Sequence, residues 1–252
     1  MGEIISVRNS STLSGSTTVS LSIATGLSYW GMQKTLLINL NDSKALEQYL
    51  STFDLKFNLD YIDNFRDIES NTYSVATSTI GDKLEVLGNF SDYNCLNQKS
   101  KEISDMLISL KENYDFIILD CSNYYNQDIL DICDKDLIMV KPSYKDVNNI
   151  KNLTDKSTII FNGIYETMKM IICEKFEEKF ANNRMFCTVN DADIYYQTNL
   201  GLHLYEYLVK NIKSNDTYIN DILEICFFIQ SLDEETSRVN KRKGGLNYKL
   251  FK

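Results

Sequence analysis

Short apolar runs alternate with longer amphipathic stretches along most of this chain. The apolar runs are rich in β-branched residues, which is typical of strands buried on both faces of a parallel sheet. We predict strands at 4–7, 35–40, 84–87, 116–119, 137–140, 158–161 and 185–188. Helical periodicity predicts helices at 17–30, 102–110, 144–153, 166–180 and 217–232. Residues 43–82 follow no regular pattern, and we expect short helices and loops there.

Strands and helices that alternate at this spacing predict βαβ units joined by right-handed crossovers. We therefore expect an α/β fold with three layers, in which a doubly wound, mostly parallel sheet lies between two layers of helices. One such domain fits residues 1–237, followed by a basic C-terminal tail at 238–252. Ligands of these sheets bind at the carboxyl ends of the strands, so we expect functional residues there.

The charge of the chain is divided between an acidic body and the basic tail. The net charge is −9, yet residues 238–252 contain six lysines and arginines and no acid. An acidic body disfavours broad nucleic-acid binding. The tail offers an anionic membrane weak attraction of about 1 kcal/mol per basic residue, without stable insertion. Because the sequence shows neither a signal peptide nor a long apolar run, we expect a cytoplasmic protein that reaches the inner membrane face at most peripherally.

The cysteines do not suggest a metal site or a disulfide framework. Six cysteines are widely spaced, none forms a C-x-x-C pair, and the chain has a single histidine. This usage is typical of buried thiols in a reducing compartment.

A polar loop rich in serine follows the first predicted strand and precedes the first predicted helix. Backbone N–H groups of a Ser/Gly loop and a helix N-terminus can hold phosphate, and a hydroxyl there can bind Mg²⁺. In this chain the segment comprises Ser14, Gly15, Ser16, Thr17 and Thr18. Ser16 and Thr17 equally fit a plain helix N-cap. Asp120, at the end of a predicted strand, is either a metal ligand or an acid that solvates the following loop.

The order of these segments resembles the ParA/MinD family of deviant Walker A P-loop ATPases. The Ser/Gly loop, the long helix and the strand ending in Asn39-Leu40-Asn41 resemble the family's opening, and 114–120 resembles its Walker B strand. Segment 140–143 resembles a strand end with proline before a later helix, and 159–162 resembles the strand whose asparagine faces adenine. The resemblance covers about residues 3–200. It implies the P-loop NTPase fold, with ATP or ADP and Mg²⁺ as cofactors.

The resemblance also implies a role for each candidate residue. Nucleotide would be held by Ser14, Gly15, Ser16, Thr17, Thr18 and, at the adenine, Asn162, and Mg²⁺ by Thr17 and Asp120. Asn162 equally fits a turn cap. We assign no catalytic residue, because the groups that the family uses for hydrolysis are absent from the matching positions.

The groups that the family uses for hydrolysis are replaced here. The family's loop reads Lys-Gly-Gly-x-Gly-Lys-Thr-Thr, and this chain has Ser11 and Ser16 at the two lysine positions. Losing the second lysine removes a charge-assisted hydrogen bond worth about 1.5 to 3 kcal/mol. The first stabilises the transferred phosphoryl group across a dimer in the family. Asn39 and Asn41 replace the family's Asp-x-Asp, and an asparagine cannot accept a proton. We therefore expect a pseudo-ATPase.

This combination favours a non-hydrolysing scaffold or positioning component of a bacterial pilus, secretion or cell-surface machine, acting as a homodimer or with a protein partner. The TadZ/CpaE branch offers a precedent for an atypical loop, although it usually carries an N-terminal domain and the first strand here begins at Glu3. One alternative is a slow ATPase of DNA or plasmid partitioning that takes its cation from Arg8 or Lys141. The other is a peripheral membrane regulator acting through the tail.

Overall fold

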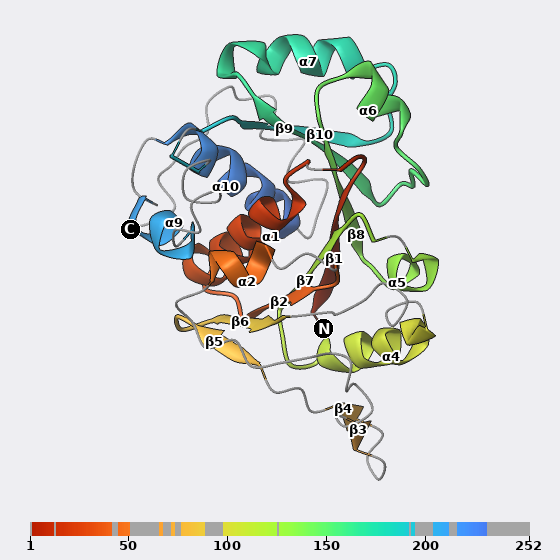
Figure 1. Ribbon diagram of the computed structural model, residues 1–252, viewed down its shortest axis with the longest axis vertical. Coiled ribbons are helices and arrows are strands. Elements are labelled where there is room, and N and C mark those ends of the chain that lie inside the picture. The colour runs from red at the N-terminus through yellow and green to blue at the C-terminus, as the bar shows by residue number, and fades with distance from the viewer. Residues whose placement is uncertain are drawn as a thin grey trace.

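An eight-stranded sheet forms the centre of the computed structural model (Figure 1). The structure describes residues 2–12, 14–41, 45–50, 66–67, 72–73, 77–88, 98–124, 126–191, 193–194, 204–211 and 216–230. The strand order is β10-β9-β8-β1-β7-β2-β6-β5, and only the edge pair β5–β6 is antiparallel among the described strands of this sheet. The bounds are β1 Glu3–Asn9, β2 Thr35–Asn39, β5 Ser78–Ile80, β6 Leu84–Leu87, β7 Phe116–Ser122, β8 Lys135–Val140, β9 Ser157–Ile164 and β10 Arg184–Val189. The expected doubly wound α/β fold is confirmed.

Helices cover both faces of the sheet and give the three layers (Figure 1). One face packs against α1 (Ser16–Thr25), its π-helical continuation η1 (Gly26–Trp30), α2 (Ala45–Tyr49), α9 (Leu204–Asn211) and α10 (Thr217–Gln230). The other face packs against α4 (Ser100–Leu110), α5 (Gln127–Asp131), α6 (Tyr144–Asn148) and α7 (Lys169–Phe176), the last preceded by the 3₁₀ turn η3 (Glu166–Met168). None of the helices in the described residues has the length and apolarity needed to cross a bilayer.

Most predicted elements are present, with the following exceptions. The helix predicted at 144–153 is wrong beyond Asn148, because Asn152 has a positive φ of 52° and the carbonyls of Lys151 and Asn152 accept hydrogen bonds from Arg8. The helix predicted at 166–180 is shorter and ends as α7 at Phe176. Helices α5 and α9 were not predicted.

The irregular segment 43–82 contains short strands as well as the expected short helix. Helix α2 lies there, β5 pairs with β6 at the sheet edge, and β3 (Arg66–Asp67) pairs with β4 (Thr72–Tyr73) in a separate antiparallel ribbon. Within that segment only residues 45–50, 66–67, 72–73 and 77–82 belong to the described part of the chain, and the whole basic tail at 238–252 lies outside it. The proposed division into 1–237 and 238–252 therefore stays a prediction.

Helix α1 is buried on nearly all sides although six of its ten residues carry hydroxyls. The hydroxyls of Ser22, Thr25 and Ser28 donate to main-chain carbonyls of the preceding turn, at 2.8, 2.7 and 2.7 Å. These bonds satisfy the polar groups inside the helix itself. As a result α1 packs between the sheet and α10 without leaving these three hydroxyls unpaired.

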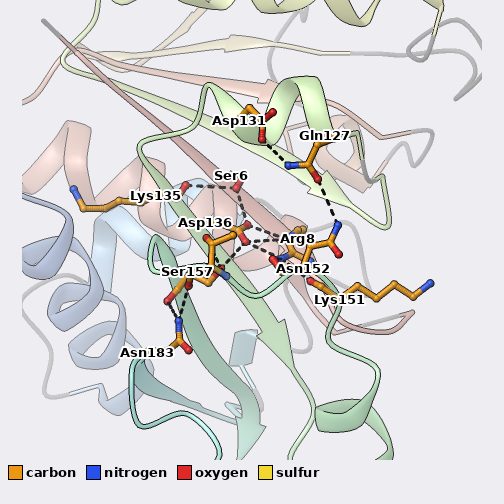
Figure 2. A network of polar contacts seen from close by, with 11 residues as sticks. Ser6, Arg8, Gln127, Asp131, Lys135, Asp136, Lys151, Asn152, Ser157 and Asn183 are labelled. Carbon is orange, nitrogen blue, oxygen red and sulfur yellow. Dashed lines mark hydrogen bonds and ion pairs between the residues drawn. The ribbon is translucent and has the colours of Figure 1, made fainter.

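A buried ion pair fixes the strand that leads into the Ser/Gly loop (Figure 2). The guanidinium of Arg8, on β1, donates to both carboxylate oxygens of Asp136, on β8, at 2.8 to 3.1 Å. Ser6 and Ser157 donate to the same carboxylate at 2.8 and 3.2 Å. The guanidinium also donates to the main chain at 151–152. The Arg8 side chain is therefore held by its bonds to β8 and to the loop after α6.

Candidate functional site

The Ser/Gly loop joins β1 to α1 at the carboxyl edge of the sheet, beside the end of β7. Within the sheet, Asp120 on β7 is in register with Val7 on β1 and with Asn39 on β2. Ser16 and Thr17 begin α1 and lie near the Asp120 carboxylate. The structure therefore brings together the loop, the helix N-terminus and the strand-end acid that sequence reasoning selected. Leu13, inside the loop, lies outside the described residues.

Gly15 occupies the N-cap position of α1, so the interpretation of Ser16 or Thr17 as the cap is wrong. Its φ is +87°, a left-handed conformation that glycine adopts without strain. A Cβ at this position would lie 2.3 Å from Nδ2 of Asn162. No side chain caps the helix at Gly15, which leaves its N-terminal N–H groups directed at the loop. The main-chain N–H of Ser16 is one exception, because it donates to Oδ1 of Asn9 at 3.3 Å.

Asn162, at the carboxyl end of β9, holds the loop in place. Its Nδ2 donates to the carbonyl of Ser14 at 2.8 Å, and its Oδ1 accepts from the Thr188 hydroxyl at 2.5 Å. The Asn162 side chain therefore links the loop, β9 and β10, and does not simply cap a turn. The predicted contact of Asn162 with adenine stays a prediction.

The Gly15 conformation leads to a test with a matched control. We expect Gly15→Ala to lower the free energy of unfolding, because the new methyl group collides with the Asn162 amide. Gly163 has a similar φ of +74°, but no atom lies within 4 Å of the position that a Cβ would take there. Gly163→Ala should therefore show only the left-handed penalty of about 1 to 2 kcal/mol. Urea unfolding of both variants measures the difference, and equal destabilisation would contradict the collision.

Asp120 is completely buried, and neither carboxylate oxygen has a hydrogen-bond partner of ordinary geometry among the described residues. Burial raises the pKa of Asp120 to about 6, and the neighbouring Thr17 hydroxyl and Asn41 amide oppose part of that rise. A buried carboxylate without a partner is costly, and a divalent cation would compensate it. The carboxylate oxygens of Asp120 and the hydroxyl of Thr17 are the kind of oxygen ligands that fit Mg²⁺.

The two strand-end asparagines are engaged with each other and with β7. The main-chain N–H of Asn41 donates to Oδ1 of Asn39 at 3.1 Å, and Nδ2 of Asn41 donates to the main-chain carbonyl of Asp120 at 3.1 Å. Both side chains thus organise the ends of β2 and β7. Asp42, the next acid along the chain, lies outside the described residues.

Ser16, which stands where the resemblance to ParA/MinD ATPases implies a phosphate-binding lysine, points its side chain toward β7. Its hydroxyl lies 2.8 Å from the hydroxyl of Ser122, and both residues are buried. Ser122 has a positive φ of 47°, which places its hydroxyl at the end of β7. The Ser16 and Ser122 hydroxyls are neutral hydrogen-bond donors, whereas a lysine at this position would be positively charged. Sequence reasoning missed Ser122, Asn9 and Thr188, and the only signal for them is their position at strand ends.

Of the two cations considered as substitutes, the structure places one on the loop. Lys141 Nζ donates to the main-chain carbonyl of Thr12 at 3.1 Å and is exposed to solvent. Arg8 is only 4% exposed and is held by Asp136, so it is not available to phosphate at the loop.

Solved structures with this arrangement are ATPases of the ParA and MinD type. No family model and no curated protein matches the sequence. A ParA family ATPase from Chlorobium tepidum TLS superposes with a TM-score of 0.70 at 14% identity, covering 90% of this chain and 99% of that protein. The septum site-determining protein MinD from Pyrococcus horikoshii OT3, complexed with Mg-ADP, gives 0.65 at 18% identity and covers 92% and 97%. A plasmid partition protein from Borrelia burgdorferi B31 bound to AMPPNP gives 0.66 at 17%, covering 91% and 99%. This chain therefore has the ParA/MinD fold.

Proposed function

We propose that this protein binds ATP or ADP with Mg²⁺ at the Ser/Gly loop and does not hydrolyse it. The observation that carries the proposal is the buried carboxylate of Asp120, without a partner of ordinary geometry in the described part of the chain, beside a glycine-capped helix N-terminus. The MinD and partition-protein structures of the same fold hold Mg-ADP and AMPPNP. In this chain, Mg²⁺ bound by Thr17 and Asp120 would neutralise phosphate charge.

The absence of hydrolysis follows from the groups that face the loop. Ser16 and Ser122 offer neutral hydroxyls, which orient an anion but supply no positive charge to a transferred phosphoryl group. Asn39 and Asn41 cannot take a proton from an attacking water. The site therefore retains groups for binding and lacks those for turnover.

We further propose that the bound form acts as a positioning component of a bacterial pilus, secretion or cell-surface machine, as a homodimer or with a protein partner. An exposed apolar surface supports a protein partner. It lies on η3 and α7, where Tyr165, Met170 and Ile171 are 72%, 73% and 51% exposed. Aromatic residues and methionine are favoured at protein interfaces.

Two rival functions predict different behaviour. A slow ATPase of DNA or plasmid partitioning is favoured by Lys141, which contacts the loop, and would show DNA-stimulated turnover. A peripheral membrane regulator would use the tail, so a chain ending at Thr236 would pellet less with anionic vesicles than the full chain. Equal pelleting would dismiss the membrane role.

Titration calorimetry of the full chain with Mg-ATP tests the proposed function. We expect saturable binding without release of phosphate. Ser16→Lys should raise the affinity about ten- to a hundredfold, because it restores a charged hydrogen bond to phosphate. Ser16→Ala is the matched control, since it removes the contact with Ser122 without adding charge. Mg²⁺-dependent turnover by wild type that Asp120→Ala abolishes would overturn the proposal.

A further inference from the structure

Two thiols from different elements lie side by side away from the Ser/Gly loop. Sγ of Cys173, on α7, is 3.6 Å from Sγ of Cys187, on β10. Both residues are partly exposed, whereas the other free cysteines among the described residues, Cys121, Cys133 and Cys226, are buried. We expected most of the cysteines to be buried thiols, which agrees with those three, and Cys173 and Cys187 are the exceptions among the described residues. A sulfur–sulfur bond is about 2.05 Å long, so the two sulfurs must approach each other by about 1.5 Å to form one.

The elements that carry the two thiols are held together by an ion pair. Lys169, at the start of α7, pairs with Asp221 on α10. The other carboxylate oxygen of Asp221 accepts a hydrogen bond from the main-chain N–H of Val189, two residues beyond Cys187, at 3.0 Å. This arrangement links α7, α10 and β10. The two sulfurs therefore stay neighbours while the fold is intact.

We propose that Cys173 and Cys187 form a reversible intramolecular disulfide when the protein meets hydrogen peroxide. In the first step the peroxide O–O bond breaks, an S–O bond forms on Cys173, and water leaves. In the second step the Cys187 sulfur attacks that sulfenic sulfur, the S–S bond forms, and the sulfenic oxygen leaves as water with the Cys187 proton. The two cysteines lose two electrons, and one peroxide is reduced to two waters.

The order of the two steps follows from the surroundings of Cys187. Burial and the adjacent Cys173 raise the pKa of the Cys187 thiol, so this residue is a neutral thiol at pH 7. A neutral thiol reacts poorly with peroxide. Cys187 is therefore the resolving sulfur and Cys173 the one oxidised first.

The disulfide would act on the Ser/Gly loop through the next residue of β10. Thr188 follows Cys187 and donates to Asn162, which in turn holds the carbonyl of Ser14. Drawing Cys187 toward α7 would strain the Thr188 bond. This consequence rests on the proposed function, and we expect the affinity for Mg-ATP to fall by up to about tenfold, the value of one hydrogen bond.

Mass spectrometry of the full-length protein after hydrogen peroxide treatment tests the disulfide without any nucleotide. We expect a loss of two hydrogens that dithiothreitol reverses. Tryptic cleavage at Lys175, Lys179 and Arg184 separates the two cysteines, so a linked peptide pair identifies the bond. Cys173→Ser and Cys187→Ser should each abolish the link. Cys133→Ser is the matched control and should retain the link, because the Cys133 sulfur is buried and donates to the Ile129 carbonyl.

Two results would overturn the proposal: oxidation of Cys173 to stable higher oxides without a link, or a link that joins either residue to another cysteine such as Cys95. The predicted effect on nucleotide binding is measured separately, by comparing the Mg-ATP affinity of reduced and oxidised protein. If neither form binds Mg-ATP, the proposed function fails and the disulfide stands. If both bind equally, the coupling through Thr188 is wrong.

Discussion

Replacing Asp120 by asparagine is expected to stabilise the nucleotide-free protein at pH 7. The carboxylate is completely buried without a hydrogen-bond partner of ordinary geometry among the described residues, and its pKa is raised from 3.8 to about 6. At pH 7 the folded protein must hold this charge, which costs up to about 3 kcal/mol. The neutral amide removes that cost. Urea unfolding at pH 7 should therefore show a gain of about 1 to 3 kcal/mol.

The pH dependence of the free energy of unfolding provides a second test of the cost of the buried Asp120 charge. A carboxyl with a raised folded-state pKa binds its proton more tightly in the folded protein, so stability rises as pH falls from about 7 through 6 toward 4. This contribution should be present in the wild type and absent from Asp120→Asn. Asp221→Asn is the control, because Asp221 also has a pKa of about 6 but is paired with Lys169 and the Val189 N–H. That variant should not be stabilised at pH 7.

With saturating Mg-nucleotide, wild type should become more stable to unfolding than Asp120→Asn, which reverses their order without ligand. A ligand that binds only the folded protein adds stability in proportion to the logarithm of its concentration over Kd. Asp120→Asn loses a negatively charged Mg²⁺ ligand and should gain little. A variant that is less stable than wild type without ligand, at pH 7, would contradict the role assigned to the buried charge.

Breaking the Arg8–Asp136 pair is expected to be the most destabilising single change. Arg8→Met removes the cation and leaves the Asp136 carboxylate, which is 7% exposed, with only the Ser6 and Ser157 hydroxyls. An uncompensated buried charge costs about 3 to 5 kcal/mol. Urea unfolding should show a loss of this size. Ser157→Ala, which removes one hydrogen bond to the same carboxylate, should cost only about 1 kcal/mol.

The double variant Arg8→Met/Asp136→Leu separates charge from packing. Replacing both members of a buried pair by apolar residues is often neutral or stabilising, so it should recover most of the stability lost by Arg8→Met. A double variant as unstable as the single one would show that the shape of the pair, rather than its charge, holds β1 to β8.

The sequence predicted the fold because buried parallel strands have a local signature. Runs such as 116–119 and 158–161 are apolar on both faces, and the loop that begins α1 follows β1 directly. The end of α6 was not predictable, because it depends on Arg8, which is more than 140 residues away in sequence. No local pattern encodes that contact.

The candidate site was predicted in position but not in contacts. Ser14 to Thr18 and Asp120 were selected from their places in the strand order, and the structure brings them together. The bond of Asn162 to the loop and the Ser16–Ser122 pair join segments that are distant in sequence. Serine and asparagine are common in any loop, so their spacing alone could not reveal these partners.

The enclosure of α1 limits how a bound ligand can alter this molecule. The helix lies between the sheet and α10, and its Ser22 and Thr25 hydroxyls, like the Ser28 hydroxyl of η1, bond to carbonyls of the preceding turn. Tilting or sliding such a helix would expose apolar surface and shear the packed layers on both sides. Helix α1 is therefore fixed relative to the sheet, so a conformational change that begins at the Ser/Gly loop must reach the surface through the strand-end connections around the helix.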